Sequence, residues 1–163
     1  MSNGTIYIFC GKMASGKSSL ARQISQQQGV PLISEDTLLG ELYPGLVVDV
    51  SSYVTHSNMV KRALMPIIVD LLRLGTSLVL DFPANTAKQR EWFKDIIDQA
   101  DARYEFHYLN CSDATCKIQL EDRARKEPDR HATDTVEMFD AITRFFEPPS
   151  MEEGFDIINH ERN

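Results

Sequence analysis

The sequence predicts an α/β domain, in which helices cover a β-sheet. Short apolar runs, typical of buried strands, alternate with longer segments in which apolar residues recur at helical spacing. A glycine-rich stretch with the spacing of a phosphate-binding loop follows the first apolar run directly. The length of 163 residues is that of one domain with a sizeable core, so we expect a single domain over residues 1–163.

The charge balance and the cysteines narrow the classes of function. The chain has 17 Lys and Arg against 24 Asp and Glu, a formal net charge of −7, which disfavours general binding to nucleic acid but leaves room for a local basic groove. No signal peptide and no membrane span are recognisable. The three cysteines are odd in number and lack metal-ligand spacing, which indicates reduced thiols. We therefore expect a cytoplasmic location.

The stretch at residues 11–18, Gly-Lys-Met-Ala-Ser-Gly-Lys-Ser, fits the pattern of glycine, four residues and Gly-Lys-Ser. It follows an apolar run at residues 5–10 that predicts a buried strand, and it opens a helix that we expect to run to about Gln28. The alternative is a chance occurrence of the pattern. The strand before and the helix after favour a true phosphate-binding loop.

The residue types of this loop suit the binding of a nucleotide phosphate. Gly11 and Gly16 keep side chains away from a backbone that must wrap a phosphate, and its N–H groups and the helix start attract an anion. Lys17 is expected to reach the β- and γ-phosphates, and the Ser18 hydroxyl to ligate Mg²⁺. We therefore predict binding of ATP with Mg²⁺, the alternative nucleotide being GTP, through Gly11, Ala14, Ser15, Gly16, Lys17, Ser18 and Ser19.

Two carboxylates follow predicted strands, at the edge where open α/β sheets bind ligands. The short second strand at residues 30–34 ends at the pair Glu35 and Asp36. Asp36 is a candidate functional group, with an N-cap of the following helix as the alternative. The apolar strand at residues 77–81 ends in Asp81, which resembles the Walker B element that holds Mg²⁺. The alternative for Asp81 is an acid that only starts a turn.

The middle of the chain carries further candidates. Residues 40–53 are predicted to form a loop, long enough for a substrate-facing segment, before a helix at about residues 54–74. Lys61 and Arg62 lie off the apolar stripe of that helix, so we expect solvated charges, with contact to a substrate anion as the alternative. We expect Trp92 to pack in the core and not to stack on a base.

A basic, polar segment at residues 123–133, interrupted by Pro128, predicts a mobile lid, because arginine binds phosphate bidentately. The alternative is a solvated charged loop. The remaining elements are predicted strands at 104–109 and 154–158 and helices at 87–100, 112–125 and 134–146.

The order of these features resembles the compact P-loop kinases: a phosphate loop, Asp36 after the second strand, Asp81 ending the third strand and an arginine-bearing lid. Within them the chain is most similar to the group of zeta toxins, chloramphenicol phosphotransferase and the kinase domain of polynucleotide kinase. It also resembles small bacterial ATP-binding proteins of uncertain substrate, through the phrases at residues 11–18, 80–85, 146–150 and 153–155.

This resemblance implies a three-layer P-loop NTPase fold of the nucleoside-monophosphate-kinase type, with a five-stranded parallel sheet in the order 2-3-1-4-5. It implies that Asp36 is the general base and that Asp81 serves the metal. It places Arg123 near the adenine and Arg130 over the phosphates. The loop residues 12–14 differ from the Gly- and Pro-richer loops of many such kinases, which weakens any assignment of the substrate by analogy.

We therefore expect an ATP-dependent phosphotransferase acting on a hydroxyl group of a small molecule, with Asp36, Lys17 and Arg130 as catalytic residues. One alternative is a nucleotide-binding switch that hydrolyses ATP slowly, which needs no base for a second substrate. Another is a nucleic-acid 5′-hydroxyl kinase, against which the acidic balance argues. The sequence does not identify the acceptor or the oligomeric state.

Overall fold

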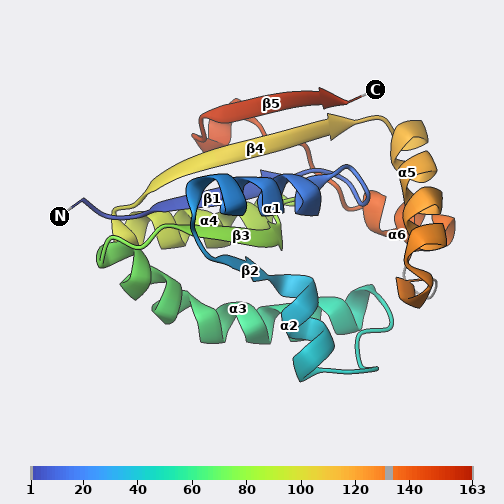
Figure 1. The fold of residues 1–163 in the computed structure, drawn as a ribbon, viewed down its shortest axis with the longest axis horizontal. Coiled ribbons are helices and arrows are strands. Elements are labelled where there is room, and N and C mark those ends of the chain that lie inside the picture. The colour runs from blue at the N-terminus through green and yellow to red at the C-terminus, as the bar shows by residue number, and fades with distance from the viewer. Residues whose placement is uncertain (1, 131–133, 163) are drawn as a thin grey trace.

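A five-stranded parallel β-sheet forms the centre of the computed structural model, which describes residues 2–130 and 134–162 (Figure 1). The strand order is β2-β3-β1-β4-β5, as the resemblance implied. Every pair of neighbouring strands is parallel. The strands are β1 (Thr5–Cys10), β2 (Leu32–Ser34), β3 (Leu78–Pro83), β4 (Arg103–Cys111) and β5 (Ile157–Arg162).

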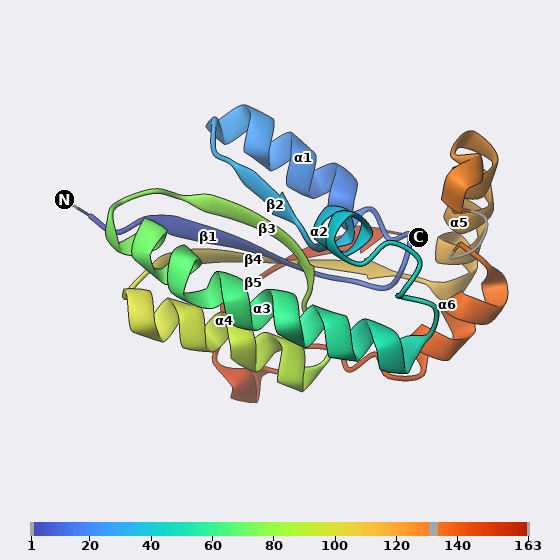
Figure 2. The ribbon, with the colours of Figure 1, turned by 90° about the horizontal axis from the view of Figure 1, so that it is seen from below.

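Helices cover both faces of this sheet, which gives the three layers expected (Figure 2). Helices α3 and α4 cover one face, and α1 packs on the other face against β1, β2 and β3. Helices α5 and α6 stand beyond the carboxyl ends of the strands (Figure 1). The helices are α1 (Lys17–Gln28), α2 (Glu35–Leu42), α3 (Val50–Arg73), α4 (Ala87–Ala100), α5 (Asp113–Lys126) and α6 (Val136–Thr143), with short 3-10 helices at Pro128–Arg130 and Met151–Glu153.

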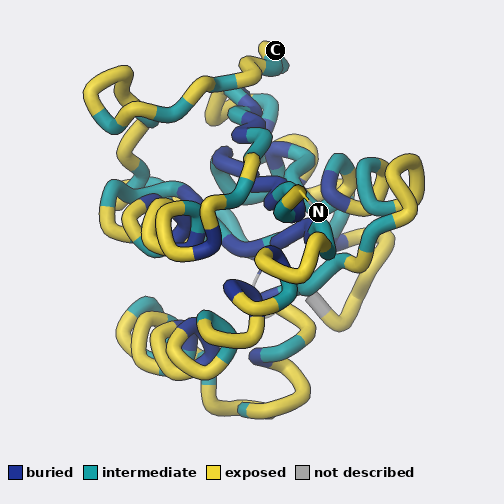
Figure 3. The backbone as a smooth tube through the Cα atoms, turned by 90° about the vertical axis from the view of Figure 1, so that its left-hand side faces the viewer, coloured by how far each residue is buried: buried dark blue, intermediate teal, exposed yellow. Residues whose placement is uncertain are grey.

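The central strand β1 is almost entirely buried, because both of its neighbours and both helical layers enclose it (Figure 3). Its side chains alternate between the two faces, as the two-residue period of a strand requires. Ile6 and Ile8 join the core beneath α3 and α4, whereas Tyr7 and Phe9 pack beneath α1. The phosphate loop therefore begins at the end of the most firmly enclosed strand of the domain.

Two sequence-based boundaries were wrong. The predicted loop at 40–53 is confined to residues 43–49, because α2 extends to Leu42 and α3 begins at Val50. Asp49 caps α3 through a reciprocal capping box with Ser52. The last strand lies at residues 157–162 and not at 154–158, so the polar tail pairs with β4.

All three cysteines are buried and free. Among the described residues, none of the helices combines the length and apolar character needed to cross a bilayer.

Candidate active site

A cleft of about 1600 Å³ opens along the carboxyl edge of the sheet. One end is formed by the phosphate loop and the start of α1, and the other by α2, the first half of α3 and the start of α4. Residues of α5 and α6 complete its wall. The predicted site residues that line this cleft are Ala14, Gly16, Lys17, Ser18, Ser19, Asp36, Asp81 and Arg123. The fold thus brings together residues of the phosphate loop, α1, α2, β3 and α5 that are up to 109 positions apart in the sequence (14 to 123).

The phosphate loop is a tight turn whose closure depends on small residues. Ala14 has φ +61° and Gly16 has φ +101°, so both adopt the left-handed conformation that creates concave rows of N–H groups. A Cβ on Gly11 would lie 2.6 Å from Ser15 Oγ, so no larger residue fits where the loop folds back. Gly11 and Ser15 are buried under the loop and do not line the cleft. Any contact of these two with phosphate would come from the backbone.

Helix α1 begins without a side-chain cap. Its N-cap is Gly16, whose backbone is left-handed and which offers no side-chain acceptor. The five other α-helices of the described residues each have a side-chain oxygen that accepts from a first-turn N–H, from Ser34, Asp49, Thr86, Ser112 and Thr135. The first-turn N–H groups of α1 therefore lack the partner that the other helices have, and a phosphate can supply it.

The Lys17 ammonium lies over the loop itself. It donates to the carbonyl oxygen of Gly11 and, at 3.0 Å, to that of Lys12. Burial lowers its pKa, while the negative charges of Asp81 and Asp36 act in the opposite direction. A cation held in this position, beside uncapped N–H groups, is suited to receive the terminal phosphates of a nucleotide.

Asp81 and Ser18 face one another across the loop. A hydrogen bond joins the Ser18 hydroxyl to the Asp81 carboxylate, and burial raises the pKa of Asp81 against that bond. In the sheet, Asp81 lies level with Ser34, the residue before α2. Among the described residues, no group of three His, Cys, Asp or Glu could hold a metal alone. The residues present fit a magnesium ion that is shared with phosphate oxygens, with Ser18 and Asp81 as the protein's ligands.

Asp36 is exposed in the first turn of α2, and the alternative in which it caps the helix is wrong. The cap is Ser34, whose hydroxyl accepts from the N–H of Thr37 at 3.3 Å. The Asp36 carboxylate lies close enough to Lys17 and Asp81 to shift both of their pKa values. It therefore lies near the residues of the phosphate loop, and it is not the residue that caps α2.

Sequence reasoning missed a buried network at the opposite end, around Glu35. Glu35 is only 1% exposed, and its two carboxylate oxygens accept from Tyr53 Oη at 2.5 Å and Ser57 Oγ at 2.7 Å. Burial raises the pKa of Glu35, and these hydrogen bonds and the charge of Lys61 oppose that rise. The signal was present in α3, where residues 53, 57 and 61 recur every four positions on one face.

Lys61 is not the solvated charge that the helical pattern indicated. It is 7% exposed and lines the cleft, with its ammonium 5.4 Å from the ring centroid of Trp92. Trp92 also lines the cleft while it packs against Phe82 and Phe93 in the core, which agrees with its expected packing role. Arg62, the next residue, is exposed at the cleft wall as expected.

The predicted lid begins inside α5. Arg123 lines the cleft from the last turn of that helix, and its guanidinium forms a bidentate ion pair with Asp134, with distances of 2.6 and 2.8 Å. Residues 128–130 form a short 3-10 helix. Residues 131–133 and the side chain of Arg130 lie outside the described part, so the predicted roles of the lid and of Arg130 stay predictions.

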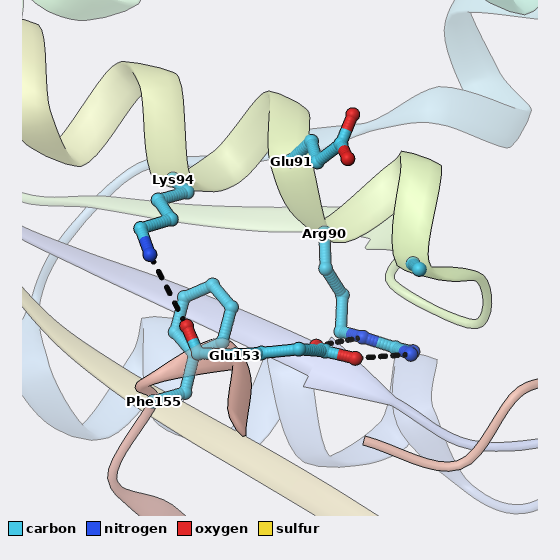
Figure 4. Close-up of a pocket in the computed structure, with 6 residues that line it drawn as sticks. Arg90, Glu91, Lys94, Glu153 and Phe155 are labelled. Carbon is cyan, nitrogen blue, oxygen red and sulfur yellow. Dashed lines mark hydrogen bonds and ion pairs between the residues drawn. The ribbon is translucent and has the colours of Figure 1, made fainter. Parts of the chain in front are cut away.

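A second, smaller pocket beside α4 is lined by the ion pair of Arg90 and Glu153 (Figure 4). Arg90, 1% exposed, forms two hydrogen bonds to Glu153, and it donates to the carbonyl oxygen of Ala84 at 2.9 Å. The next residue, Asn85, accepts from the N–H of Gly11 at 2.8 Å. Arg90 therefore fixes the turn after β3, and that turn supports the phosphate loop.

The sequence profile of the AAA domain family matches residues 6–149, which is most of the chain. No curated protein matches this sequence.

Several solved structures share the fold. A provisionally assigned kinase from Chloroflexus aurantiacus has a TM-score of 0.74 and 17% identity, over 99% of this chain and 89% of that one. A gluconokinase from Sinorhizobium meliloti has a TM-score of 0.60 and 15% identity, over 98% and 82%. The APS kinase of Mycobacterium tuberculosis, solved with AMPPNP and APS, has a TM-score of 0.57 and 20% identity, over 78% and 77%. At these identities the likeness shows a P-loop NTPase fold, and the narrower resemblance to zeta toxins and their group stays a prediction.

Proposed function

The chain belongs to the AAA domain family, and we propose that it is a kinase that moves the γ-phosphate of ATP to a hydroxyl group of a small-molecule acceptor. The observation that carries the proposal is the position of Asp36. It is an exposed carboxylate without a capping role, in the same cleft as Lys17, Ser18 and Asp81. A nucleotide switch needs the last three residues and has no use for the first.

The names of the structural neighbours support the same class. The gluconokinase and the APS kinase are kinases by name, and the latter was solved with an ATP analogue and APS together. The fold is shared, and the cleft of the present chain has room beyond the phosphate loop for a second substrate.

In the proposed reaction the loop binds the phosphates through the uncapped start of α1. Lys17 exchanges its hydrogen bonds with the carbonyl oxygens of Gly11 and Lys12 for phosphate oxygens. Ser18 and Asp81 would hold Mg²⁺, which would supply positive charge to the phosphates when bound. In the proposed lid, Arg123 lies near the adenine and Arg130 reaches over the phosphates, where it adds positive charge as the lid closes.

Asp36 performs the proton transfer. As the acceptor oxygen forms its bond to the γ-phosphorus, the bond from that phosphorus to the β-phosphate oxygen breaks. The acceptor hydroxyl loses its proton to the Asp36 carboxylate, and ADP leaves. An exposed carboxylate with no hydrogen bond inside α2 is free to accept that proton.

The test combines an acceptor screen with the substitution Asp36→Asn. Purified protein, ATP and Mg²⁺ are incubated with a library of hydroxylated metabolites, and formation of ADP and of phosphorylated product is measured. We expect acceptor-dependent turnover in the wild-type protein and a loss of roughly a hundredfold to ten-thousandfold in Asp36→Asn, the usual cost of losing a general base. ATP affinity by calorimetry is expected to stay within about twofold.

Two results would reject this assignment. Near-normal phosphoryl transfer in Asp36→Asn would remove the base and favour the nucleotide switch. A shift in Mg²⁺ dependence, with acceptor dependence unchanged, would make Asp36 a metal residue. Thr37→Ala, next along α2, is the control for local disturbance, because Thr37 contributes only its N–H to the cap.

A further inference from the structure

Lys61 presents an ammonium group that the protein itself leaves without a bonded partner. Within residues 2–130 and 134–162, its Nζ forms neither a hydrogen bond nor an ion pair, although the side chain is 7% exposed. Its contacts are the face of Trp92, at 5.4 Å, and the nearby charge of Glu35. The Nζ atom is not among the buried atoms that lack a partner, so the ammonium opens onto the cleft although most of the side chain is covered. Its donors are therefore available to an anionic ligand in the cleft.

Glu35 does not supply the missing partner. Both of its carboxylate oxygens already accept hydrogen bonds, from Tyr53 and Ser57, and Lys61 lies beyond ion-pair distance of them. Ser57 and Lys61 are one helical turn apart on α3, a rise of about 6 Å. The network therefore holds Glu35 at one turn and leaves the three N–H donors of Lys61 at the next turn, at the wall of the cleft.

The neighbouring cations are arranged differently. Arg62 is exposed to solvent, and Lys12 pairs with Asp113 at 2.7 Å. Lys17 donates to two loop carbonyls. Among these cations that line the cleft, Lys61 alone combines burial with free donors in the described residues, and it lies at the end opposite the phosphate loop.

We propose that Lys61 is the anchor for an anionic group of the acceptor, so that the acceptor is an acid bearing a hydroxyl, and not a neutral alcohol. This inference rests on the proposed function, because it names the substrate of the same cleft. An oxyanion, such as a carboxylate, would accept from the Lys61 ammonium in a charge-assisted hydrogen bond. Tyr43, Tyr53 and Trp92 line the same end and provide apolar surface for the carbon skeleton.

The anchor also orients the acceptor for transfer. With its anion at Lys61 on α3, the acceptor would lie in the same cleft as Asp36. Glu35, the neighbour of Asp36 in α2, is near enough to Lys61 for their charges to interact. An acid held at one end cannot present its carboxylate to Asp36, because like charges repel there. Lys61 is thus a residue that selects and positions the acceptor, and Asp36 is the residue that reacts with it.

Trp92 provides a direct readout, because it is the only tryptophan of the chain. Its emission is recorded while the protein is titrated with matched pairs of compounds: gluconate with sorbitol, pantothenate with panthenol, and benzoate with benzamide. We expect saturable changes with members of the anionic series and none with their neutral partners. In Lys61→Met, the affinity for those anions should fall by roughly 10- to 100-fold, the usual effect of losing a hydrogen bond to a charged group.

The control is Lys94→Met, which removes the same charge from α4 two residues from Trp92, outside the cleft. It should bind the anions as the wild type does. The unfolding midpoint of Lys61→Met is measured as well, and we expect a modest fall because buried Glu35 loses a nearby positive charge. If it does not fold, Lys61→Arg, which keeps the charge, must retain the preference for anions.

Equal binding of neutral and anionic partners, unchanged binding in Lys61→Met, or no saturable change with any anion would each overturn the inference. Phosphorylation of a neutral alcohol would overturn it too, while leaving the proposed kinase function standing. Conversely, anions that bind through Lys61 without any ATP-dependent phosphorylation would reject the proposed function itself. The two failures therefore give different results in the binding and turnover assays.

Discussion

The two ends of the cleft are built in opposite ways. The phosphate end is one stretch of eight residues, 11–18, whose important groups are backbone N–H groups and a single lysine. The acceptor end is assembled from side chains of α2, α3 and α4, with Glu35, Tyr53, Lys61 and Trp92 brought together from 58 positions of sequence (35 to 92). The first is a local structure that one strand and one helix define, and the second exists only after the domain has folded.

Because the two ends are built differently, a sequence motif can indicate nucleotide binding but not the identity of the acceptor. A backbone loop binds any nucleotide phosphate, so its sequence pattern is shared and informative about chemistry but silent about the acceptor. The proposed selectivity for an acceptor depends instead on side chains, such as Lys61 and Trp92, that lie far apart in the sequence. Substitutions at the phosphate end should therefore lower turnover, whereas those at the proposed acceptor end should lower stability.

The largest effect is expected at the phosphate end, from Lys17→Ala. Loss of the ammonium that contacts the transferred phosphates should lower turnover by about a thousandfold or more. The substitution removes no core contact, so the thermal unfolding midpoint should stay close to that of the wild type. Measured ATP turnover, calorimetric ATP affinity and thermal unfolding check this. Unchanged ATP affinity and turnover would contradict the assignment of the loop, and Lys117→Ala, outside the cleft, is the control.

At the proposed acceptor end, substitution of Glu35 should lower the free energy of unfolding. Glu35→Ala removes the acceptor of two hydrogen bonds, so the hydroxyl groups of Tyr53 and Ser57 lose their partner, and Lys61 loses a nearby negative charge. We expect a fall of about 3 kcal/mol in the free energy of unfolding. The matched control is Asp36→Ala, one residue along the helix but exposed, which should cost less than about 0.5 kcal/mol. Urea unfolding measures both, and equal losses would erase the contrast between the ends.

The smallest expected effect is a change of stability with pH, and it comes from His107, which lies outside the cleft. His107 is 6% exposed, stacks on Phe9 and lies 3.0 Å from a ring nitrogen of His160. Burial, and then the proximity of His160, lower the pKa of His107 from 6.5 to about 4, and the carboxylate of Glu105, 3.9 Å away, does not reverse this. The neutral ring is thus the folded form.

Because the folded pKa lies below the unfolded value, the stability is fully present above about pH 6.5 and falls as the pH drops toward 4. Between pH 7 and 5 we expect a loss of about 1–2 kcal/mol, and His107→Phe should remove that part of the pH dependence. Urea unfolding at several pH values measures it. A slope that persists in His107→Phe would place the titrating group elsewhere, with the cleft carboxylates as the next candidates.

The strands and the phosphate-binding loop could be predicted because their patterns are local, whereas the strand order followed only from the resemblance to P-loop kinases. The predicted edge of the sheet is the one along which the candidate cleft opens. The sequence did not reveal that Lys61 is buried, since an off-stripe lysine is covered only when Trp92, 31 positions later, packs against α3 (61 to 92). It predicted a fifth strand but placed it at residues 154–158, because the polar residues Asn159 to Arg162 do not look like a strand and form one through backbone pairing with β4.

The loop at 40–53 was only partly correct for a related reason. Gly40 and the pair Pro44 and Gly45 favour a turn, but Ser34 caps the preceding helix and Leu39 is buried, so α2 continues through Gly40. Tertiary packing overrode the local preference. In all three cases, Lys61 in α3, strand β5 and the segment at 40–53, contacts between residues distant in the sequence determine the structure.

The central place of β1 has a consequence for how the chain folds. Its partners are β3 and β4, which are 68 and 93 residues further along, counted from Cys10 to Leu78 and Arg103. During synthesis, the apolar strand that leads into the phosphate loop leaves the ribosome before both of its partners and stays unpaired until they have followed. Parallel pairing at such separation is slow, and an apolar strand without partners is prone to aggregate in the meantime. The segment best recognised in the sequence is therefore the one that acquires its native surroundings late.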